Sequence, residues 1–223
     1  MFARLPSLTR LSAVRWDDVR KAAHIKLYAG DLPRSYPQYH THYGLSPQPT
    51  TRRTIKHDIR DPMPLAENTV TVYQAEDVLE HIEPERLGDV IADIYRVLKP
   101  GGLFRLSVPD YRFNYYAHRC VRKPDGTILF DPGGGGRLVN GRPALGAHLW
   151  FPTTEVVLKV LQNSPFGGQG GQIRMLHGYL QDGTSLMEPI DYKLGFIQRT
   201  PDHDPRGRHP YRPVSIVADC LKM

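Results

Sequence analysis

The sequence predicts an α/β fold built around a mostly parallel sheet, because one strand, one helix and one further strand follow each other closely. β-Branched and aromatic residues at 69–74 predict the first strand. Apolar residues then recur at three- and four-residue spacing from Pro84 to Leu98, which is typical of a helix with one buried face. Pro100-Gly101-Gly102 ends that helix, and residues 103–108 predict the second strand. Such a unit is typical of the right-handed crossover between parallel strands.

Other apolar segments predict the remaining elements. Five more strands are expected, at residues 24–28, 41–45, 54–59, 173–180 and 215–221. Helices are expected at 11–22 and from Thr153 or Thr154 onward, where either threonine can cap the helix. Two loop insertions interrupt this pattern, near 110–149 and 191–212. No repeat or second core is visible, so we expect a single domain over residues 1–223.

Composition narrows the class of protein. A chain of 223 residues with 40% hydrophobic and 23% charged residues is typical of a folded α/β domain. No run approaches the roughly 18 apolar residues that a membrane helix needs, and the first twenty residues have no leader-like pattern, so a cytoplasmic protein is expected. The net charge of +6 is scattered and does not by itself indicate nucleic-acid binding. Cys120 and Cys220 stand alone, which predicts neither a disulfide framework nor a zinc site.

Three motifs in the centre of the chain resemble one enzyme family. They are the Asp58-to-Val70 connector with its Pro-Met-Pro-Leu segment, Glu80-His81-Ile82, and Arg96-Val97-Leu98-Lys99-Pro100-Gly101-Gly102. In this order they resemble the central part of class I S-adenosylmethionine-dependent methyltransferases of the type 11 group. The match covers about residues 55–110, and Ser164-Pro165-Phe166 stands where that family often has Ala-Gly-Phe. The resemblance implies a Rossmann-like sheet with helices on both faces, an antiparallel final strand, and S-adenosylmethionine as cofactor.

Two positions depart from the family pattern. The first strand of the family leads into a Gly-x-Gly-x-Gly loop, but here only Ala29-Gly30-Asp31 remains, followed by Pro33 and Pro37. The second strand of the family ends in an acidic residue that holds the ribose, but here that place has Gly44-Leu45-Ser46. Two interpretations stay open: a shortened loop still holds the cofactor, or cofactor binding is weakened or lost.

The expected cofactor site lies where parallel strands end. Ligands bind beyond the carboxyl ends of the strands in an open parallel sheet, and this places Gly30, Asp31, Asp58, Gln74 and Glu76 around one crevice. The resemblance implies that Asp58 and Ile59 hold the adenine and that Gln74-Ala75-Glu76 lies where the methionine end and the acceptor meet. Alternatively, Asp58 and Asp31 belong to ordinary turns. The full expected set is Tyr28, Ala29, Gly30, Asp31, Ser46, Asp58, Ile59, Gln74, Ala75 and Glu76.

Four residues are candidates for catalysis. His81 and His148 can accept a hydroxyl proton near neutral pH, and His148 stands beside two aromatic residues at the end of a glycine-rich loop. Asp110 and Tyr111 follow the strand at 103–108 and reach the crevice edge. His81 equally suits a local role at a helix start, and Tyr111 suits the core. Methyl transfer requires no metal, and Asp202-His203-Asp204 is more typical of a solvated loop, so no metal site is expected.

The favoured function is methylation of an oxygen on a small polar or sugar acceptor. Residues 74–77, Gln-Ala-Glu-Asp, lack the Asn/Asp-Pro-Pro-Tyr/Phe segment of enzymes that methylate base amino groups in DNA, so a nucleic-acid substrate is disfavoured. A hydride-transferring enzyme is disfavoured because no Gly-x-Gly-x-x-Gly fingerprint is present. The alternative is a non-catalytic binding protein on a degenerate methyltransferase fold. The sequence does not indicate an oligomeric state.

Overall fold

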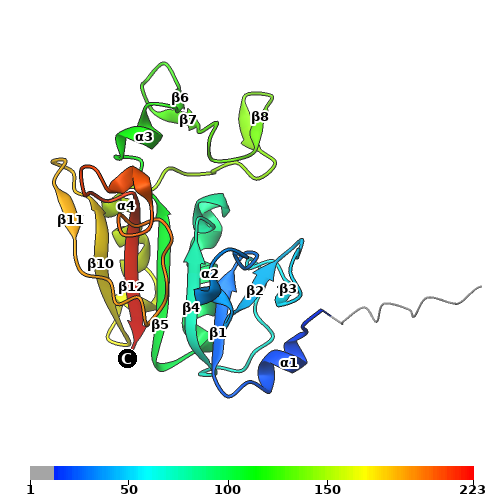
Figure 1. Ribbon diagram of the computed structural model, residues 1–223. Coiled ribbons are helices and arrows are strands. Elements are labelled where there is room, and N and C mark those ends of the chain that lie inside the picture. Colours follow the sequence, from blue (N-terminus) through cyan, green and yellow to red (C-terminus); the bar gives the residue numbers. More distant parts are fainter. Residues whose placement is uncertain (1–12) are drawn as a thin grey trace, which may run out of the picture.

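The computed structural model, which describes residues 13–223, contains an eight-stranded mixed sheet (Figure 1). Its strand order is β11-β10-β12-β5-β4-β1-β2-β3, and β3, β2, β1, β4 and β5 are parallel. The last strand, β12, is antiparallel to both β5 and β10. The predicted mostly parallel sheet with an antiparallel final strand is therefore confirmed. The strands are β1 (Ile25–Ala29), β2 (Tyr43–Ser46), β3 (Thr54–Lys56), β4 (Val70–Glu76), β5 (Leu98–Pro109), β10 (Gly171–Tyr179), β11 (Ser185–Met187) and β12 (Ser215–Lys222).

The β4, α2 and β5 unit forms as the sequence predicts. Helix α2 (Leu87–Val97) follows a 3₁₀ turn at Pro84–Arg86, and its periodic apolar residues are buried. Strand β5 begins directly at Leu98 and pairs in parallel with β4. The helix therefore ends before Pro100-Gly101-Gly102, which was expected to end it and instead lies inside β5, where the register with β4 shifts. The predicted helix at 11–22 is shorter in the described residues, where α1 covers Trp16–Arg20; residues 11 and 12 lie outside them.

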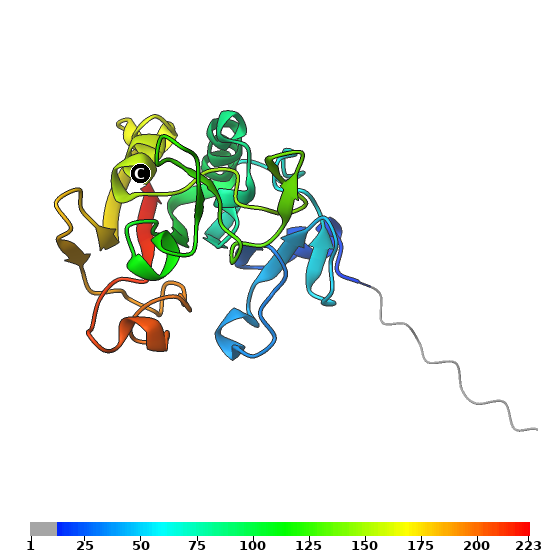
Figure 2. The same ribbon diagram turned by 90° about the horizontal axis from the view of Figure 1, so that it is seen from above.

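The two longest helices of the described residues, α2 and α4 (Thr154–Gln162), cover the same face of the sheet (Figure 2). Both pack on one core with side chains of β1, β4, β5 and β12. The opposite face is covered by residues 31–42 and 188–214 instead of the expected helices. Prolines such as Pro33 and Pro37 explain part of this difference, since proline lacks the N–H that a helix interior needs.

Buried polar side chains hold these loops on the second face. Arg105 on β5 is fully buried and forms a two-pronged ion pair with Asp219 on β12, with both N···O distances at 2.7 Å. Its Nη1 donates to the carbonyls of Asp191 (2.9 Å) and Gly195. A buried guanidinium is tolerated only when its donors find acceptors, so Arg105 fixes the start of the 191–212 insertion on the sheet.

Glu76 at the end of β4 also holds the loops of the second face on the sheet. Its carboxylate accepts hydrogen bonds from the hydroxyl of Tyr39, from the amide of Gln74 (2.8 Å) and from the backbone N–H of Gln198 (2.9 Å). Burial raises the pKa of Glu76 to about 7, although the Tyr39 hydrogen bond opposes that shift. The two loops of the second face thus meet on one carboxylate.

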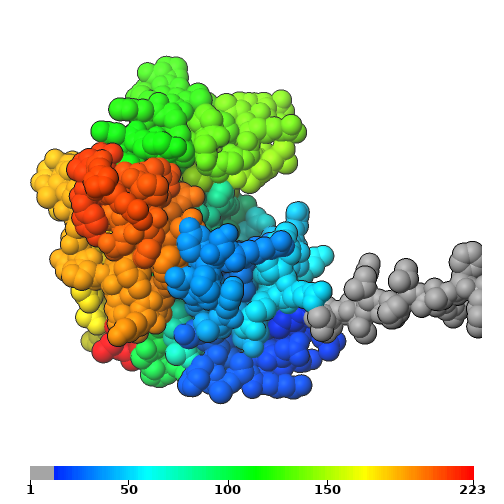
Figure 3. Space-filling view, viewed as in Figure 1, coloured from blue at the N-terminus to red at the C-terminus, as the bar shows by residue number. Residues whose placement is uncertain are grey.

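The insertion at 110–149 stands above the carboxyl ends of the strands (Figures 1 and 3). It contains a short helix and two small hairpins that the sequence pattern does not predict. They are α3 (Asn114–Ala117), β6 (Val121–Arg122) with β7 (Ile128–Phe130), and β8 (Arg137–Val139) with β9 (Arg142–Ala144). Among the residues the structure describes, no helix has the length and apolar character needed to cross a membrane.

Replacing Arg105 by methionine is expected to destabilise the fold strongly. Arg105→Met leaves the Asp219 carboxylate and two loop carbonyls without their donor, and breaking a buried pair in this way costs about 3–5 kcal/mol. Urea unfolding measures the loss. The control Arg20→Met removes an exposed pair with Asp17 and should cost less than about 1 kcal/mol. Equal losses in the two variants would contradict the anchoring role of Arg105.

Candidate functional site

A cleft of about 500 Å³ opens at the carboxyl ends of the parallel strands. Its floor is formed by residues at or just beyond the ends of β1, β2, β3 and β4, and its roof by residues 144–147 and Leu149 of the 110–149 insertion. Figure 3 shows the surface hollowed between the 110–149 segment and the strands below it. The cleft therefore lies at the edge where ligands bind in open α/β sheets.

Three of the expected cofactor residues line this cleft: Gly30, Asp58 and Ile59. Gly30 has a φ of +100°, a conformation that favours glycine, and exchanges backbone hydrogen bonds with Leu45 (2.7 and 3.1 Å). Asp58 accepts the backbone N–H of Arg60 (3.0 Å) and also pairs with its guanidinium (2.6 Å). These Arg60 hydrogen bonds lower the pKa of Asp58 and keep it ionised. Asp58 is thus both a turn cap and a charged acceptor at the cleft.

The other expected cofactor residues near β1 and β2 are used inside the fold. Tyr28 packs edge-on against Tyr39 on the second face, and Ala29 is buried in the core beneath the helices. Asp31 accepts the backbone N–H of Thr50 at 3.0 and 3.1 Å. Ser46 accepts the N–H of Gln48 (3.2 Å) in the following turn. None of these four residues lines the cleft.

The end of β4 is likewise occupied by the second-face loops. Gln74 donates to the carbonyl of Phe196, Ala75 is buried in the core, and Glu76 holds Tyr39 and Gln198 as described. The next residue, Asp77, has a φ of +53° and pairs with Arg199 of the insertion at 2.7 Å. The structure therefore separates Gln74, Ala75 and Glu76 from the cleft that contains Gly30, Asp58 and Ile59.

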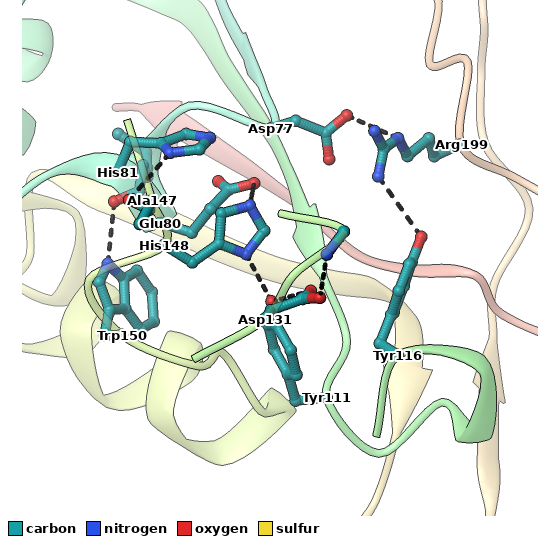
Figure 4. Close-up of polar contacts among 12 residues, drawn as sticks. Asp77, Glu80, His81, Tyr111, Tyr116, Asp131, Ala147, His148, Trp150 and Arg199 are labelled. Atoms are coloured by element: carbon teal, nitrogen blue, oxygen red, sulfur yellow. Dashed lines mark hydrogen bonds and ion pairs between the residues drawn. The ribbon is translucent and has the colours of Figure 1, made fainter. Parts of the chain in front are cut away.

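The two expected histidine bases come together (Figure 4). His81 ends a 3₁₀ turn (Leu79–His81) after β4, and His148 lies in the loop before α4. Their ring centroids are 4.6 Å apart, and His148 Nε2 lies 3.7 Å from Oε1 of Glu80. The backbone N–H of Leu149 donates to the carbonyl of Glu80 (2.8 Å), and the indole of Trp150 donates to the carbonyl of Leu79 (2.9 Å). These bonds fix the loop against the turn.

A chain of hydrogen bonds sets the tautomer of His148. Arg119 pairs with Asp131 through two contacts of 2.7 Å, and the hydroxyl of Tyr111 donates to the same carboxylate (2.7 Å). Burial would raise the pKa of Asp131, but hydrogen bonds from Arg119 and Tyr111 hold it below its ordinary value. Because the Tyr111 proton points to Asp131, the Tyr111 oxygen accepts from Nδ1–H of His148 at 2.5 Å. Nε2 of His148 is then unprotonated and faces Glu80.

The glycine-rich run at 133–136 allows this arrangement. A Cβ on Gly134 would lie 2.7 Å from the imidazole of His148, which is closer than side chains tolerate. The backbone N–H of Gly133 also donates to Asp131 (2.8 Å). The run therefore lets the insertion pass directly over the His148 ring.

The charges of this cluster follow from burial. Glu80 is fully buried, and neither of its carboxylate oxygens has a hydrogen-bond partner among the described residues. Burial and then the charge of Asp77 raise its pKa well above the ordinary value. Burial, followed by the neighbouring His81, lowers the pKa of His148 to about 4, and burial also lowers that of His81. Both imidazoles are therefore neutral at pH 7.

Asp110 and the 202–204 segment have structural partners. Asp110 is buried and accepts the backbone N–H groups of Arg112 (2.9 Å) and Tyr179 (2.7 Å). Asp202 accepts the hydroxyls of Tyr192 (2.5 Å) and Tyr211 (2.7 Å). His203 contacts the Ile197 carbonyl, and Asp204 pairs with Arg206.

Sequence reasoning missed Glu80, Asp131 and Arg119 as members of the site. Glu80 was visible only as part of the Glu80-His81-Ile82 motif, next to a candidate base. Asp131 precedes Pro132 and the glycine run. An acidic residue at the start of such a run indicates a turn in which the carboxylate accepts backbone N–H groups. Arg119 carries no comparable signal, because its partner lies twelve residues away.

A family model described as a methyltransferase domain matches residues 29–106. These residues run from the end of β1 into β5 and include the floor of the cleft. The sheet around this segment is the Rossmann-like α/β sheet that the central motifs imply. The resemblance found in the central motifs is thereby confirmed, and its matched region is longer than those motifs.

Several solved methyltransferase structures are similar to this chain. An S-adenosylmethionine-dependent methyltransferase from Mesorhizobium loti shares 14% identity over 89% of this chain and 90% of its own, with a TM-score of 0.48. One from Archaeoglobus fulgidus shares 12% identity over 93% and 90%, with a TM-score of 0.45. The 1,6-didemethyltoxoflavin-N1-methyltransferase from Burkholderia thailandensis, solved with S-adenosylhomocysteine, shares 11% over 90% and 72%, with a TM-score of 0.49. No curated protein matches the sequence.

His148 is expected to stay neutral in the folded protein down to about pH 5. Its pKa of about 4 lies below the ordinary 6.5, so the unfolded chain takes up a proton first as the pH falls. The stability contributed by the neutral ring is present above about pH 6.5 and is lost as the pH falls toward 4. Histidine NMR, assigned with His148→Gln, measures this titration. A His148 midpoint near 6.5 would contradict the buried setting described above.

Proposed function

We propose that this protein is an S-adenosylmethionine-dependent methyltransferase that holds its cofactor in the cleft above β1 to β4. The observation that carries the proposal is the meeting of Gly30, Asp58 and Ile59 on one cleft with His81 at its wall. The methyltransferase-domain match covers the strands that form this floor. The cleft volume of about 500 Å³ lies within the usual range of small-molecule sites, roughly 300–1,000 Å³.

The residues of the cleft suit the adenosine part of the cofactor. Apolar side chains on its floor, among them Leu45, Ile59 and Val78, would pack on the adenine ring, and the ionised Asp58 would accept from its amino group. Gly30 lets the backbone come close to the ligand. No acidic side chain follows β2, so the ribose hydroxyls would depend on backbone groups there.

The reaction needs few groups from the protein. When bound, S-adenosylmethionine supplies a methyl group on a positively charged sulfur. The chain must then align an acceptor oxygen and remove its proton. His81 lines the cleft in its neutral form and is the proposed first proton acceptor, while His148 and Glu80 lie directly behind it.

A small polar or sugar hydroxyl is the proposed acceptor. The roof formed by residues 144–149 limits the size of what can enter, and a neutral imidazole suits a hydroxyl that must lose its proton. The basic residues are not gathered into a cluster in the sequence, which does not favour a nucleic-acid substrate. A cytoplasmic location, expected from the sequence, is part of the same proposal.

A second candidate function is a binding protein that does not transfer methyl groups. Asp31, Gln74 and Glu76 are the observation that favours it, because all three are engaged inside the fold at positions where the family would use them for the cofactor. Such a protein would keep the cleft but take another ligand.

Asp58→Ala is expected to weaken binding of S-adenosylhomocysteine about tenfold or more. Losing one hydrogen bond to a charged acceptor costs roughly 1.5–3 kcal/mol. Isothermal titration measures the affinity of both variants and of the parent protein. Asp61→Ala is the control, because Asp61 is exposed and does not line the cleft. Absence of binding by the parent protein at millimolar ligand would favour the second candidate function.

Replacing either histidine should lower turnover without weakening cofactor binding. General-base catalysis contributes about 100-fold or more, so His81→Ala and His148→Ala should lose at least that factor in kcat. Their S-adenosylhomocysteine affinities should stay within a few-fold of the parent value. Turnover is measured from S-adenosylhomocysteine release with panels of hydroxyl acceptors. Parallel loss of affinity and turnover in His148→Ala would show that His148 acts by supporting the cleft.

A further inference from the structure

Three potential ligand side chains converge at the wall of the cleft: Glu80, His81 and His148 (Figure 4). One ligand atom of each lies within 4.8 Å of the others. Glu80 is fully buried, His148 is 5% exposed, and His81 alone reaches the cleft. The cluster is thus enclosed by protein on one side and accessible on the other.

The hydrogen bonds around the two imidazoles leave one nitrogen of each ring free. Nδ1–H of His148 is taken by the Tyr111 oxygen, as the chain from Arg119 and Asp131 requires. Nδ1 of His81 lies 3.2 Å from the carbonyl of Ala147, which can only accept, so this nitrogen carries the proton. In both rings the remaining nitrogen, Nε2, has a lone pair and no proton. Metal-binding histidines are commonly oriented in this way through their second nitrogen.

The Glu80 side chain supplies a second observation at this cluster. Both of its carboxylate oxygens are buried and without a hydrogen-bond partner among the described residues. A proton shared with His148 would not satisfy them, since 3.7 Å is too long for such a hydrogen bond and the second oxygen would still be unpaired. A buried carboxyl group is either kept neutral by a proton or paired with a positive charge, and a cation between Glu80 and the two imidazoles would give the ionised carboxylate that partner.

We propose that Glu80, His81 and His148 form a binding site for a divalent transition-metal ion, with Zn²⁺ as its ordinary occupant. Two imidazoles, one carboxylate and a position left for water or substrate make a common donor set for catalytic zinc. Bonds of about 2.0–2.2 Å to each ligand need the ligand atoms about 3.3–3.5 Å apart. Glu80 and His148 are already at 3.7 Å, so only His81 would have to turn inward.

This site goes beyond the proposed methyl transfer and does not depend on it. With an ion bound, the lone pair of His81 Nε2 would be used for coordination, so the ion would take over from His81 the removal of the acceptor proton. Because His81 lines the cleft, the open position of the ion would face the space in which an acceptor lies. An acceptor hydroxyl bound there would lose its proton more readily, since a metal ion lowers the pKa of a coordinated oxygen. Tyr111 and Asp131 would then be positioning residues, which act by holding Nε2 of His148 toward the ion.

Co²⁺ titration of the full chain after dialysis against EDTA tests the site. Visible absorption should show about one Co²⁺ per chain with the strong bands of four- or five-coordinate nitrogen and oxygen ligands, and added Zn²⁺ should remove them. Glu80→Gln and His148→Gln should each weaken binding about 100-fold or more. Tyr111→Phe should weaken it about 10- to 100-fold, as expected for a group that orients a ligand.

Matched variants separate this site from other histidines and from misfolding. His40→Gln changes an exposed histidine, and Glu83→Gln changes a carboxylate of the cleft that lies outside the cluster. Both should bind Co²⁺ like the parent protein, and circular dichroism confirms that each variant is folded. No saturable Co²⁺ binding by the parent protein would overturn the proposal. Binding unchanged in folded Glu80→Gln, or lost in His203→Gln, would overturn it as well. Because absorption reads the metal directly, failure of methyl transfer would leave these results unaffected.

Discussion

The buried ion pair between Arg105 and Asp219 is the interaction on which the second face of the sheet depends. A Rossmann-like sheet is normally covered by helices on both sides, and helices satisfy their own backbone groups. Here the loops at 31–42 and 188–214 take that place, so their carbonyl and N–H groups must find partners on the strands. Arg105, Gln74 and Glu76 provide them.

This way of covering the sheet determines where the site can lie. At the end of β4, Glu76 and Asp77 are bonded to residues 198 and 199 of the 191–212 insertion and do not line the cleft. The space that remains open lies toward β1, β2 and β3, under residues 144–149. Gly30 and the end of β2, which no acidic residue follows directly, both border this space.

Local patterns in the sequence were sufficient for most of the sheet. The apolar spacing of α2 and the β-branched strand β4 are short-range features, and each formed where it was expected. Pro100-Gly101-Gly102 lies inside β5 and does not form the expected helix end. The covering of the second face could not be predicted in this way, since Arg105 meets Asp219 across more than a hundred residues. The arrangement of the site could not be predicted from local patterns either. His81 and His148 were recognised by their chemistry, but their meeting with Glu80 and the role of Asp131 depend on contacts between distant segments.

The close packing of Gly134 on the His148 ring links the position of the glycine run to the site. Glu80 and His81 belong to the turn after β4, whereas Asp131 and His148 belong to the insertion above it. The N–H of Gly133 donates to Asp131, which holds Tyr111, so a movement that lifts the glycine run would loosen the hydrogen-bond chain to His148. The cluster is thus assembled from two segments of the chain. Glu80, His81 and His148 lie together only while residues 131–149 stay packed on the turn after β4.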